Sequence, residues 1–119
     1  MASSEPLEKY TQEKILQWLA YKKIFAWANK TQGTFDPKRK VFRTNKKQLK
    51  GVPDILGILP DGRFLGIEVK RRPNILSPDQ IAFRIRAKAS NAVCLVAYSL
   101  EDVTEFFAYE FFVVRKPQP

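Results

Sequence analysis

The chain has 119 residues, a single cysteine, no histidine and a formal net charge of +9. Its length fits one compact domain over residues 1–119, with residues 1–6 and 116–119 as loose termini. Without histidine, a histidine general base and the Cys–His sets that bind zinc or haem are excluded. No stretch approaches the ~20 apolar residues of a membrane span. A single cysteine forms no internal disulfide, so we expect a reducing compartment, the cytoplasm.

The positive charge is concentrated in two blocks, and this distribution predicts an anionic partner. Residues 38–50 hold seven basic groups and no acidic group, and residues 71–90 hold five basic groups and one acidic group. The segment between them, residues 51–70, has three acidic and two basic groups, a net charge of −1. The acidic side chains of this middle segment therefore lie between two strongly basic flanks.

Hydrophobic periodicity and turn residues predict a mixed α/β domain with the order helix, strand, hairpin, helix, strand, helix, strand. The predicted ranges, in that order, are 7–23, 24–31, 54–59 with 64–70, 78–89, 92–98, 100–108 and 110–115. Residues 36–50 are expected to be mostly irregular. Ser77, Pro78 and Gln80 indicate a helix start, because an N-cap serine and a glutamine three residues later form a capping box. Ser99 is predicted to cap the following helix.

The predicted hairpin brings two carboxylates together. Residues 60–62 (Pro-Asp-Gly) fit a three-residue loop with the glycine in the left-handed position. Counting back from this loop places Asp54 opposite Glu68, on one face of the sheet and ~5 Å apart at Cβ. A two-residue turn would separate the two acids onto opposite faces, but the proline favours the longer loop. Carboxylates this close repel one another unless a divalent cation such as Mg²⁺ neutralises them.

Lys70 lies on the same face as Glu68, at the end of the second hairpin strand, because side chains two residues apart share a face. A lysine beside paired carboxylates can orient or deprotonate a water, or stabilise charge on a phosphate during transfer. An Asp, a Glu and a Lys around a metal ion suit phosphodiester hydrolysis without a histidine. The alternative interpretation is a turn aspartate followed by a solvated Glu-x-Lys strand.

The first predicted helix carries Glu8, Gln12, Ile15 and Leu19 on one stripe, because their spacing is 4-3-4. The apolar half of this stripe faces the core, so the polar half is expected to point inward too, toward the metal site. The alternative is an ordinary solvated first turn.

The hairpin and the helix start that follows it resemble the VRR-Nuc domain, a branch of the PD-(D/E)XK nuclease superfamily. The matching segments are Gly-Val-Pro-Asp at 51–54, Asp-Gly-Arg-Phe at 61–64, Ile-Glu-Val-Lys at 67–70 and Leu-Ser-Pro-Asp-Gln at 76–80. The chain looks like a stand-alone, phage- or bacterial-type member, similar to Holliday-junction resolvases. The resemblance implies a restriction-endonuclease-like mixed sheet flanked by helices, and a DNA endonuclease that depends on Mg²⁺ or Mn²⁺ and acts on branched DNA.

The resemblance also implies roles for residues of the hairpin. Asp54, Glu68 and the backbone carbonyl of Val69 would bind the metal ion. Lys70 would complete the catalytic set together with the two carboxylates.

Further roles are implied for residues outside the hairpin. Gln80 matches the family's helical glutamine, which belongs to the catalytic set. Glu8 and Gln12 match an acidic or amide residue on the family's first helix and are further metal-ligand candidates. Ala28 stands where many relatives have an arginine within an aromatic-Arg-x-Asn pattern, so a DNA contact from that position is not implied.

Basic residues around the motif are the expected DNA-binding groups, because lysine and arginine neutralise phosphates and make affinity salt-dependent. Arg84 and Lys88 share a helix face, with Arg86 on the same helix. No base-reading motif is present, which favours recognition of backbone path and branch shape. The expected DNA-binding residues are Lys38, Arg39, Lys40, Arg43, Lys46, Lys47, Lys50, Arg71, Arg72, Arg84 and Lys88.

An aromatic cluster near the C-terminus has two interpretations, core packing or the interface of a two-fold homodimer. Its members are Phe106, Phe107, Tyr109, Phe111 and Phe112. The resemblance to resolvases implies a homodimer, since two active sites related by a two-fold axis cut strands symmetrically. Cys94 is expected to be an inert core residue.

Two alternatives to a self-sufficient endonuclease stay open. One is a non-catalytic DNA-binding module that has kept the fold, and the other is a nuclease subunit whose specificity comes from a partner chain. The intact set of Asp54, Glu68 and Lys70 favours an enzyme. No membrane partner is expected.

Overall fold

The computed structural model describes residues 6–30, 34–36, 41–43 and 48–112, with side chains for 6–30 and 48–110. Within these ranges, no helix has the length and apolar character needed to cross a membrane. The helices are α1 (Glu8–Tyr21), α2 (Pro78–Ala89), α3 (Leu100–Phe107) and a π-helical turn, η1 (Ala108–Phe112). The strands are β1 (Phe25–Ala28), β2 (Thr34–Asp36), β3 (Val41–Arg43), β4 (Ile55–Ile58), β5 (Phe64–Val69) and β6 (Val93–Ala97).

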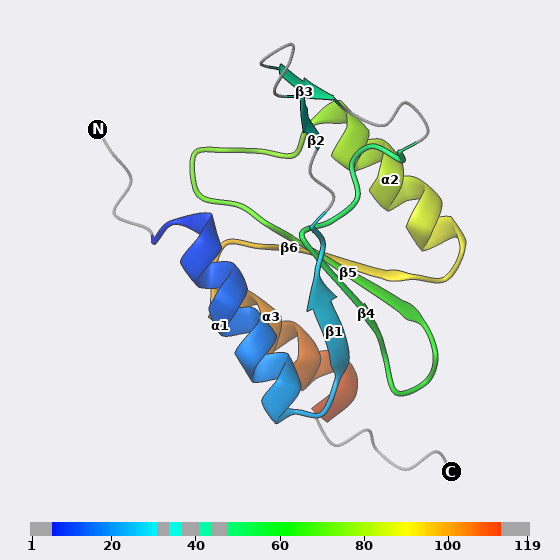
Figure 1. Ribbon diagram of the computed structural model, residues 1–119. Helices are drawn as coiled ribbons and strands as arrows, with labels where there is room; N and C mark the ends of the chain where they lie inside the picture. The colour runs from blue at the N-terminus through cyan, green and yellow to red at the C-terminus, as the bar shows by residue number, and fades with distance from the viewer. Residues whose placement is uncertain (1–5, 31–33, 37–40, 44–47, 113–119) are drawn as a thin grey trace.

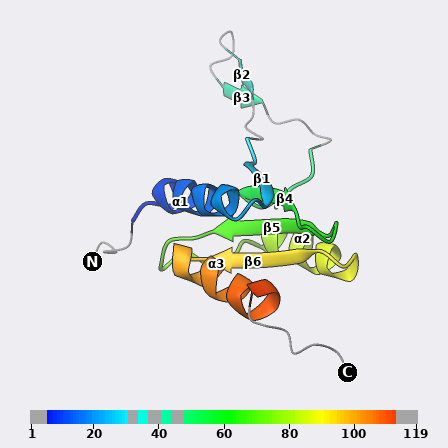
Figure 2. The same ribbon diagram turned by 90° about the horizontal axis from the view of Figure 1, so that it is seen from below.

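A four-stranded mixed sheet forms the centre of the fold, with the strand order β1-β4-β5-β6. The first three strands are antiparallel, whereas β6 runs parallel to β5. A parallel pair needs a crossover connection, which α2 supplies. Helices α1 and α3 cover one face of the sheet and α2 covers the other (Figures 1 and 2). The predicted α/β class, a mixed sheet flanked by helices, is therefore confirmed.

The hydrophobic core lies between the sheet and the pair α1 and α3. Alternate residues of β5 point into it, as the period-2 pattern predicts. Helices α1 and α3 contribute residues spaced four apart, which is the spacing of one helix face. The fully buried members include Ile15, Leu19, Ile55, Leu65, Ile67, Val69, Val103 and Phe107.

The hairpin register is the one that a three-residue loop dictates. The backbone N–H of Leu59 donates to Arg63 at 2.8 Å, and Ile58 pairs with Phe64. Gly62 has φ +92°, the left-handed conformation that glycine adopts without a steric penalty. Continued by one residue pair beyond Ile55 and Ile67, this register places Asp54 opposite Glu68.

Both predicted helix caps are present. The Ser77 hydroxyl accepts a hydrogen bond from the Gln80 N–H at 3.2 Å, and the Gln80 side-chain oxygen accepts one from the Ser77 N–H at 2.8 Å. These two bonds complete a capping box at the start of α2. At the start of α3, the Ser99 hydroxyl accepts from the Asp102 N–H at 3.3 Å.

Two predictions of local structure were wrong. The segment predicted to be irregular contains β3, which pairs antiparallel with β2, because Thr34-Phe35-Asp36 and Val41-Phe42-Arg43 are rich in β-branched and aromatic residues. The strand predicted at 110–115 is helical through Phe112, and residues 113–115 lie outside the described part of the chain. The apolar face of α3, which buries Val103 and Phe107, carries the helical backbone onward and overrides the β propensity of the aromatic residues.

The aromatic cluster divides between core and surface. Phe107 is fully buried, with its ring centroid 5.6 Å from Trp18 and 5.5 Å from Phe106. Core packing is therefore correct for Phe106 and Phe107, whereas Tyr109 is exposed. The side chains of Phe111 and Phe112 lie outside the described residues. Cys94 is buried, and burial raises the pKa of its thiol, as expected for an inert core cysteine.

Candidate active site

Asp54 is held at the end of β4 by the strands on both sides. One of its carboxylate oxygens, Oδ2, accepts a hydrogen bond from the Val69 N–H at 2.9 Å, which links it to β5. The Asp54 carbonyl accepts from the Asn29 N–H at 2.7 Å, and the Asn29 side chain donates to the Pro53 carbonyl at 3.2 Å. Asn29 was not among the predicted site residues. It lies within the predicted first strand, 24–31, and the aromatic-Arg-x-Asn pattern of many relatives was the signal at this place; in the structure it directly follows β1.

Glu68 is a buried carboxyl with one oxygen paired and one unpaired. The residue is 6% exposed, and its Oε1 accepts a hydrogen bond from the Gln80 side-chain N–H at 3.0 Å. Within the described part of the chain, the buried Oε2 has no hydrogen-bond partner. Burying a carboxylate oxygen without a partner costs free energy, and a bound cation or a proton on this oxygen would remove that cost.

Gln80 connects the capping box to the buried glutamate. Its side-chain oxygen is engaged by the Ser77 N–H, so its N–H group is turned toward Glu68. The helix start thereby fixes the orientation of an amide whose two ends are otherwise hard to distinguish. The predicted capping residue and the predicted catalytic glutamine are thus the same side chain, and it acts on Glu68 as a positioning residue.

The electrostatics of the site favour a proton or a cation on Glu68. Burial raises the pKa of this carboxyl from 4.5 to about 8, with further increases from the Asp54 carboxyl. The ammonium group of Lys70 acts in the opposite direction and lowers the pKa, while Glu8 raises it. The charges of Asp54, Lys70 and Glu8 are thus all close enough to affect the ionisation of Glu68.

Lys70 lies directly beyond β5. Its N–H donates to the Ala97 carbonyl at 2.9 Å, which fixes the backbone against β6. Its side chain is half-buried and lies on the Glu68 side of the strand, as the alternation predicts. A cation at this position stands beside the paired carboxylates.

Helix α1 carries two predicted site residues, Glu8 and Gln12, and Glu8 lies at the edge of the site. Glu8 Oε1 accepts a hydrogen bond from the Arg71 N–H at 3.2 Å, so it lies beside the residue that follows Lys70. Gln12 is half-buried on the same helix, and the structure describes no hydrogen bond from it to the carboxylates. Among the described residues, no three Asp, Glu or Cys side chains are gathered closely enough to hold a metal ion. Glu8 lies beside Arg71, at the edge of the carboxylate pair, and its role as a metal ligand stays a prediction.

The chemistry of the donor set fits a hard divalent cation. Mg²⁺ takes oxygen ligands, and it commonly binds through one or two carboxylates while it keeps several waters. Asp54, Glu68 and the Val69 carbonyl could supply three oxygens, with the unpaired Glu68 Oε2 among them. A bound cation would remove both the repulsion between the carboxylates and the cost of that buried oxygen.

The loop before Asp54 is locked against the start of α2 by a glycine. Gly51 has φ +78°, and a Cβ atom at this position would overlap the backbone carbonyl of Asp79. Only glycine satisfies both conditions. This contact explains why the Gly-Val-Pro-Asp segment begins with glycine, and it ties the strand carrying Asp54 to the helix carrying Gln80.

The predicted DNA-binding residues are only partly described. Lys38, Arg39, Lys40, Lys46 and Lys47 lie outside the described residues, and Arg43 is described only by its backbone, in β3.

The described cations surround α2 and the loop after β5. Lys50 and Arg72 are exposed, and the Arg72 guanidinium lies 4.4 Å from the centroid of the Tyr98 ring. Arg84 is half-buried, and it and the exposed Lys88 lie close enough to Cys94 on β6 to offset part of the increase that burial causes in the pKa of its thiol. Both cations therefore face β6, as their predicted shared helix face requires.

Comparisons with known proteins identify the fold. No family model matches the sequence, and no curated protein matches it. A solved structure described as "VRR_NUC domain" superposes with a TM-score of 0.65 at 19% sequence identity, covering 87% of this chain and 97% of that chain. The resemblance predicted from the hairpin sequence is thus confirmed in three dimensions. The chain has the fold of a VRR_NUC domain.

Proposed function

We propose that this protein is a metal-dependent DNA endonuclease that hydrolyses phosphodiester bonds. The observation that carries the proposal is the pairing of Asp54 with Glu68, of which the second is buried and has an unpaired oxygen beside Lys70. A buried carboxyl with a strongly raised pKa beside a second acid and a lysine is typical of a functional site. The VRR_NUC fold adds support, since nucleases of the PD-(D/E)XK type generally use divalent metal ions.

We assign the metal to Asp54, Glu68 and the Val69 carbonyl. Bound there, Mg²⁺ or Mn²⁺ would supply Lewis-acid stabilisation of phosphate charge and lower the pKa of a bound water. The Val69 N–H orients the Asp54 carboxylate, and the Gln80 N–H orients Glu68. Lys70 stabilises the charge that develops on the phosphate, because a fixed ammonium in a partly buried site acts more strongly than one in water.

The surface cations bind the DNA backbone. Arg72 and Arg84 lie on the β6 side of the site, and Lys50 and Arg86 line a groove on the other side of α2. Together with the net charge of +9, these groups would neutralise phosphates on both sides of the carboxylates. We infer steep salt dependence and recognition of the path of the backbone, which suits branched DNA such as a Holliday junction.

We further propose that the protein acts as a homodimer. Phe106 and Phe107 belong to the core, which leaves Tyr109 as the described exposed member of the aromatic cluster, and α2 offers a second apolar surface. Helix α2 has no fully buried residue, and its Ile81 and Ile85 are 46% and 64% exposed. Side chains four apart share a helix face, so the two isoleucines form an apolar stripe that a second copy of α2 can cover about a two-fold axis. An Ile85→Glu variant that remains folded but sediments as a monomer would support this interface.

The cellular compartment follows from the single cysteine. The Cys94 thiol is buried and unpaired, which suits a reducing environment. We place the activity in the cytoplasm.

The experiment that tests the function is a cleavage assay on matched four-way junction, flap, duplex and single-stranded DNA. It is run with Mg²⁺, Mn²⁺ or EDTA, for the wild type, Asp54→Ala and the control Glu105→Gln, which alters an exposed acid on α3. Metal-dependent cleavage that is lost only in Asp54→Ala supports the nuclease, and paired symmetric nicks on the junction support the resolvase. Salt-sensitive binding without cleavage would instead favour a binding module, or a subunit that needs a partner.

A further inference from the structure

An exposed aromatic pair lies on the same sheet face as the carboxylates. Glu68 faces α2, and Asp54 is opposite Glu68 in the hairpin register. Side chains two residues apart in a strand share a face, so Leu56 and Ile58 also lie on the α2 side of the sheet. Trp27 and Phe25 are their register partners in β1 and lie on this side too.

Within the described residues, no helix packs over the β1 and β4 half of this face, because α2 covers only the other half. Phe25, Trp27 and Ile58 are 67%, 40% and 43% exposed, although their neighbours on the opposite face pack toward the core. Helix α2 packs instead over β6 and, through contact of Phe83 with Phe64, over β5. The Phe25 and Trp27 ring centroids are 5.0 Å apart, with the rings tilted by 46°. The result is an aromatic surface over β1 and β4, which we call the β1 platform.

The distance from the β1 platform to the carboxylates matches a nucleic acid strand. Trp27 pairs with Leu56, two residues along β4 from Asp54, and Phe25 pairs with Ile58, four residues from Asp54. At ~3.3 Å per strand residue, these positions lie about 7 Å and about 13 Å from the carboxylate level. Stacked bases rise by about 3.4 Å each, so the backbone levels of Trp27 and Phe25 lie within a few nucleotides of a phosphate held at Asp54 and Glu68.

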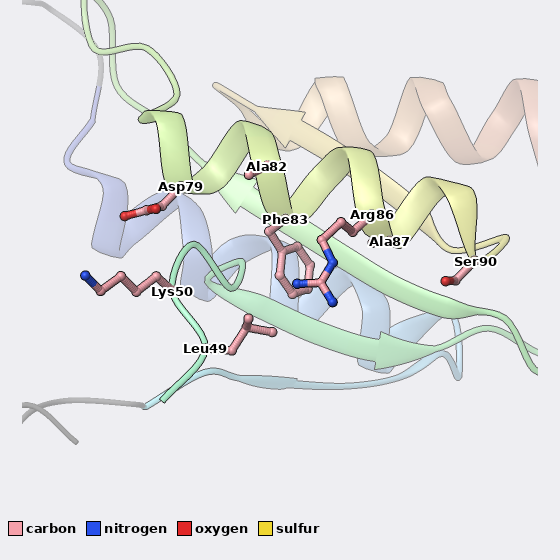
Figure 3. Close-up of a pocket in the computed structure, with 8 residues that line it drawn as sticks. All are labelled: Leu49, Lys50, Asp79, Ala82, Phe83, Arg86, Ala87 and Ser90. Carbon is pink, nitrogen blue, oxygen red and sulfur yellow. The ribbon is translucent and has the colours of Figure 1, made fainter. Parts of the chain in front are cut away.

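A groove that holds two cations runs along α2, the helix on the same sheet face as the β1 platform. This groove has a volume of about 390 Å³, and its lining includes the cations Lys50 and Arg86, the acid Asp79, and Leu49 and Phe83. Figure 3 shows Leu49 and the Arg86 guanidinium on either side of the Phe83 ring. Lys50 and Arg86 supply positive charge along the groove that contains the Phe83 ring. Such a combination of stacking rings and a basic groove is characteristic of surfaces that bind single strands.

We propose that the β1 platform binds unpaired bases of the DNA strand that enters the active site. Aromatic side chains stack on the faces of bases, and those faces are accessible only where the strand is unpaired. The inference rests on the proposed nuclease function and narrows its substrate to DNA with single-stranded character next to the cleaved phosphate. A second copy of the chain is the alternative occupant. It is less favoured because the homodimer proposed above uses the Ile81 and Ile85 stripe of α2, and because a surface beside the carboxylates suits a substrate strand.

The test measures binding rather than cleavage. The wild type, Phe25→Leu, Trp27→Leu, Trp27→Phe and the control Tyr109→Leu are titrated in EDTA with oligothymidylate and with a blunt hairpin duplex. Tyr109 is an exposed aromatic residue on η1, so its replacement controls for a general loss of apolar surface. The altered side chains are exposed, and a thermal melt of each variant confirms that it is folded. Tryptophan fluorescence gives a second readout, since stacking on Trp27 quenches its emission.

We expect each leucine variant to lose between about 5-fold and about 150-fold in affinity for oligothymidylate, the range that base stacking on one aromatic ring supplies. Trp27→Phe and Tyr109→Leu should stay within about 3-fold of the wild type, and duplex affinity should not change. The fluorescence quenching should disappear in Trp27→Leu.

Three results would overturn the proposal. The first is an unchanged affinity for oligothymidylate in both leucine variants. The second is an equal loss of affinity for oligothymidylate and for the duplex. The third is that the leucine variants no longer self-associate in sedimentation but still bind DNA normally. The last would assign the platform to a protein interface. Because binding is measured without metal, absence of cleavage by the wild type would count against the proposed function and not against the platform.

Discussion

Replacing Glu68 with glutamine should stabilise the metal-free protein while it abolishes cleavage. The glutamate is 6% exposed, and burial together with the neighbouring Asp54 raises its pKa to about 8. Glutamine has nearly the same shape and keeps an oxygen that can accept the hydrogen bond from Gln80. The glutamine side chain carries no charge, so it avoids both the cost of removing a carboxylate from water and the repulsion by the Asp54 carboxylate.

The magnitude follows from the two pKa values. In the unfolded chain Glu68 ionises near 4.5, and in the folded protein near about 8. Between these values the folded state holds a proton that the unfolded state has released, so stability falls as pH rises. For the wild type without metal, this group alone lowers the free energy of unfolding by about 4 kcal/mol between pH 5 and pH 9. The Glu68→Gln variant lacks this dependence.

The assay is denaturant unfolding in EDTA at pH 5, 7 and 9, for the wild type, Glu68→Gln and the exposed-acid control Glu105→Gln. The stability advantage of Glu68→Gln should be small at pH 5 and grow by about 4 kcal/mol by pH 9, or by roughly 15 °C in thermal midpoint for a chain of this size. Stability differences that stay constant from pH 5 to pH 9 would refute the reasoning, since they would mean that Glu68 ionises normally. Saturating Mn²⁺ should then stabilise the wild type at pH 7 and leave Glu68→Gln nearly unchanged.

Three further variants test the parts around this carboxyl. Lys70→Ala should keep DNA and metal binding but lose cleavage by a factor of ~100 or more, measured in single turnover, because a positioned charge is removed; normal cleavage would disprove the site assignment. Gln80→Ala should lower thermal stability by about 2 kcal/mol and reduce cleavage, whereas Ser77→Ala should lower stability alone, since it removes only the cap; equal cleavage by the two variants would rule out positioning. Gly51→Ala should destabilise the fold by about 3 kcal/mol or more in denaturant unfolding, because its Cβ meets the Asp79 carbonyl at positive φ.

Local sequence signals predicted the parts of the fold that depend on short-range chemistry. The loop at residues 60–62 sets the hairpin register, because its geometry allows only one alignment of the two strands. Register in turn decides which residues face each other, so Asp54 opposite Glu68 followed from counting alone. The capping box at Ser77 and Gln80 was equally local, since both of its hydrogen bonds lie within one turn of helix.

Other features depended on contacts between segments far apart in the chain. Strand propensity predicted the wrong structure for residues 110–112, because burial of Val103 and Phe107 kept the chain helical. The role of Asn29 as an anchor for Asp54 required β1 to pair with β4, which no local pattern specifies. The gap in coverage that exposes Phe25 and Trp27 likewise arises only from where α2 packs.

The sequence by itself determined the charge of the protein, the order of most of its elements and the pairing of its two central carboxylates. Each of these follows from composition, from periodicity or from one tight turn, all of which act over a few residues. Only the tertiary structure decided that Glu68 is buried with an unpaired oxygen, that Gln80 is turned toward it, and that half of the sheet face stays open. Burial and orientation are properties of packing, in which residues distant along the chain remove water from one another.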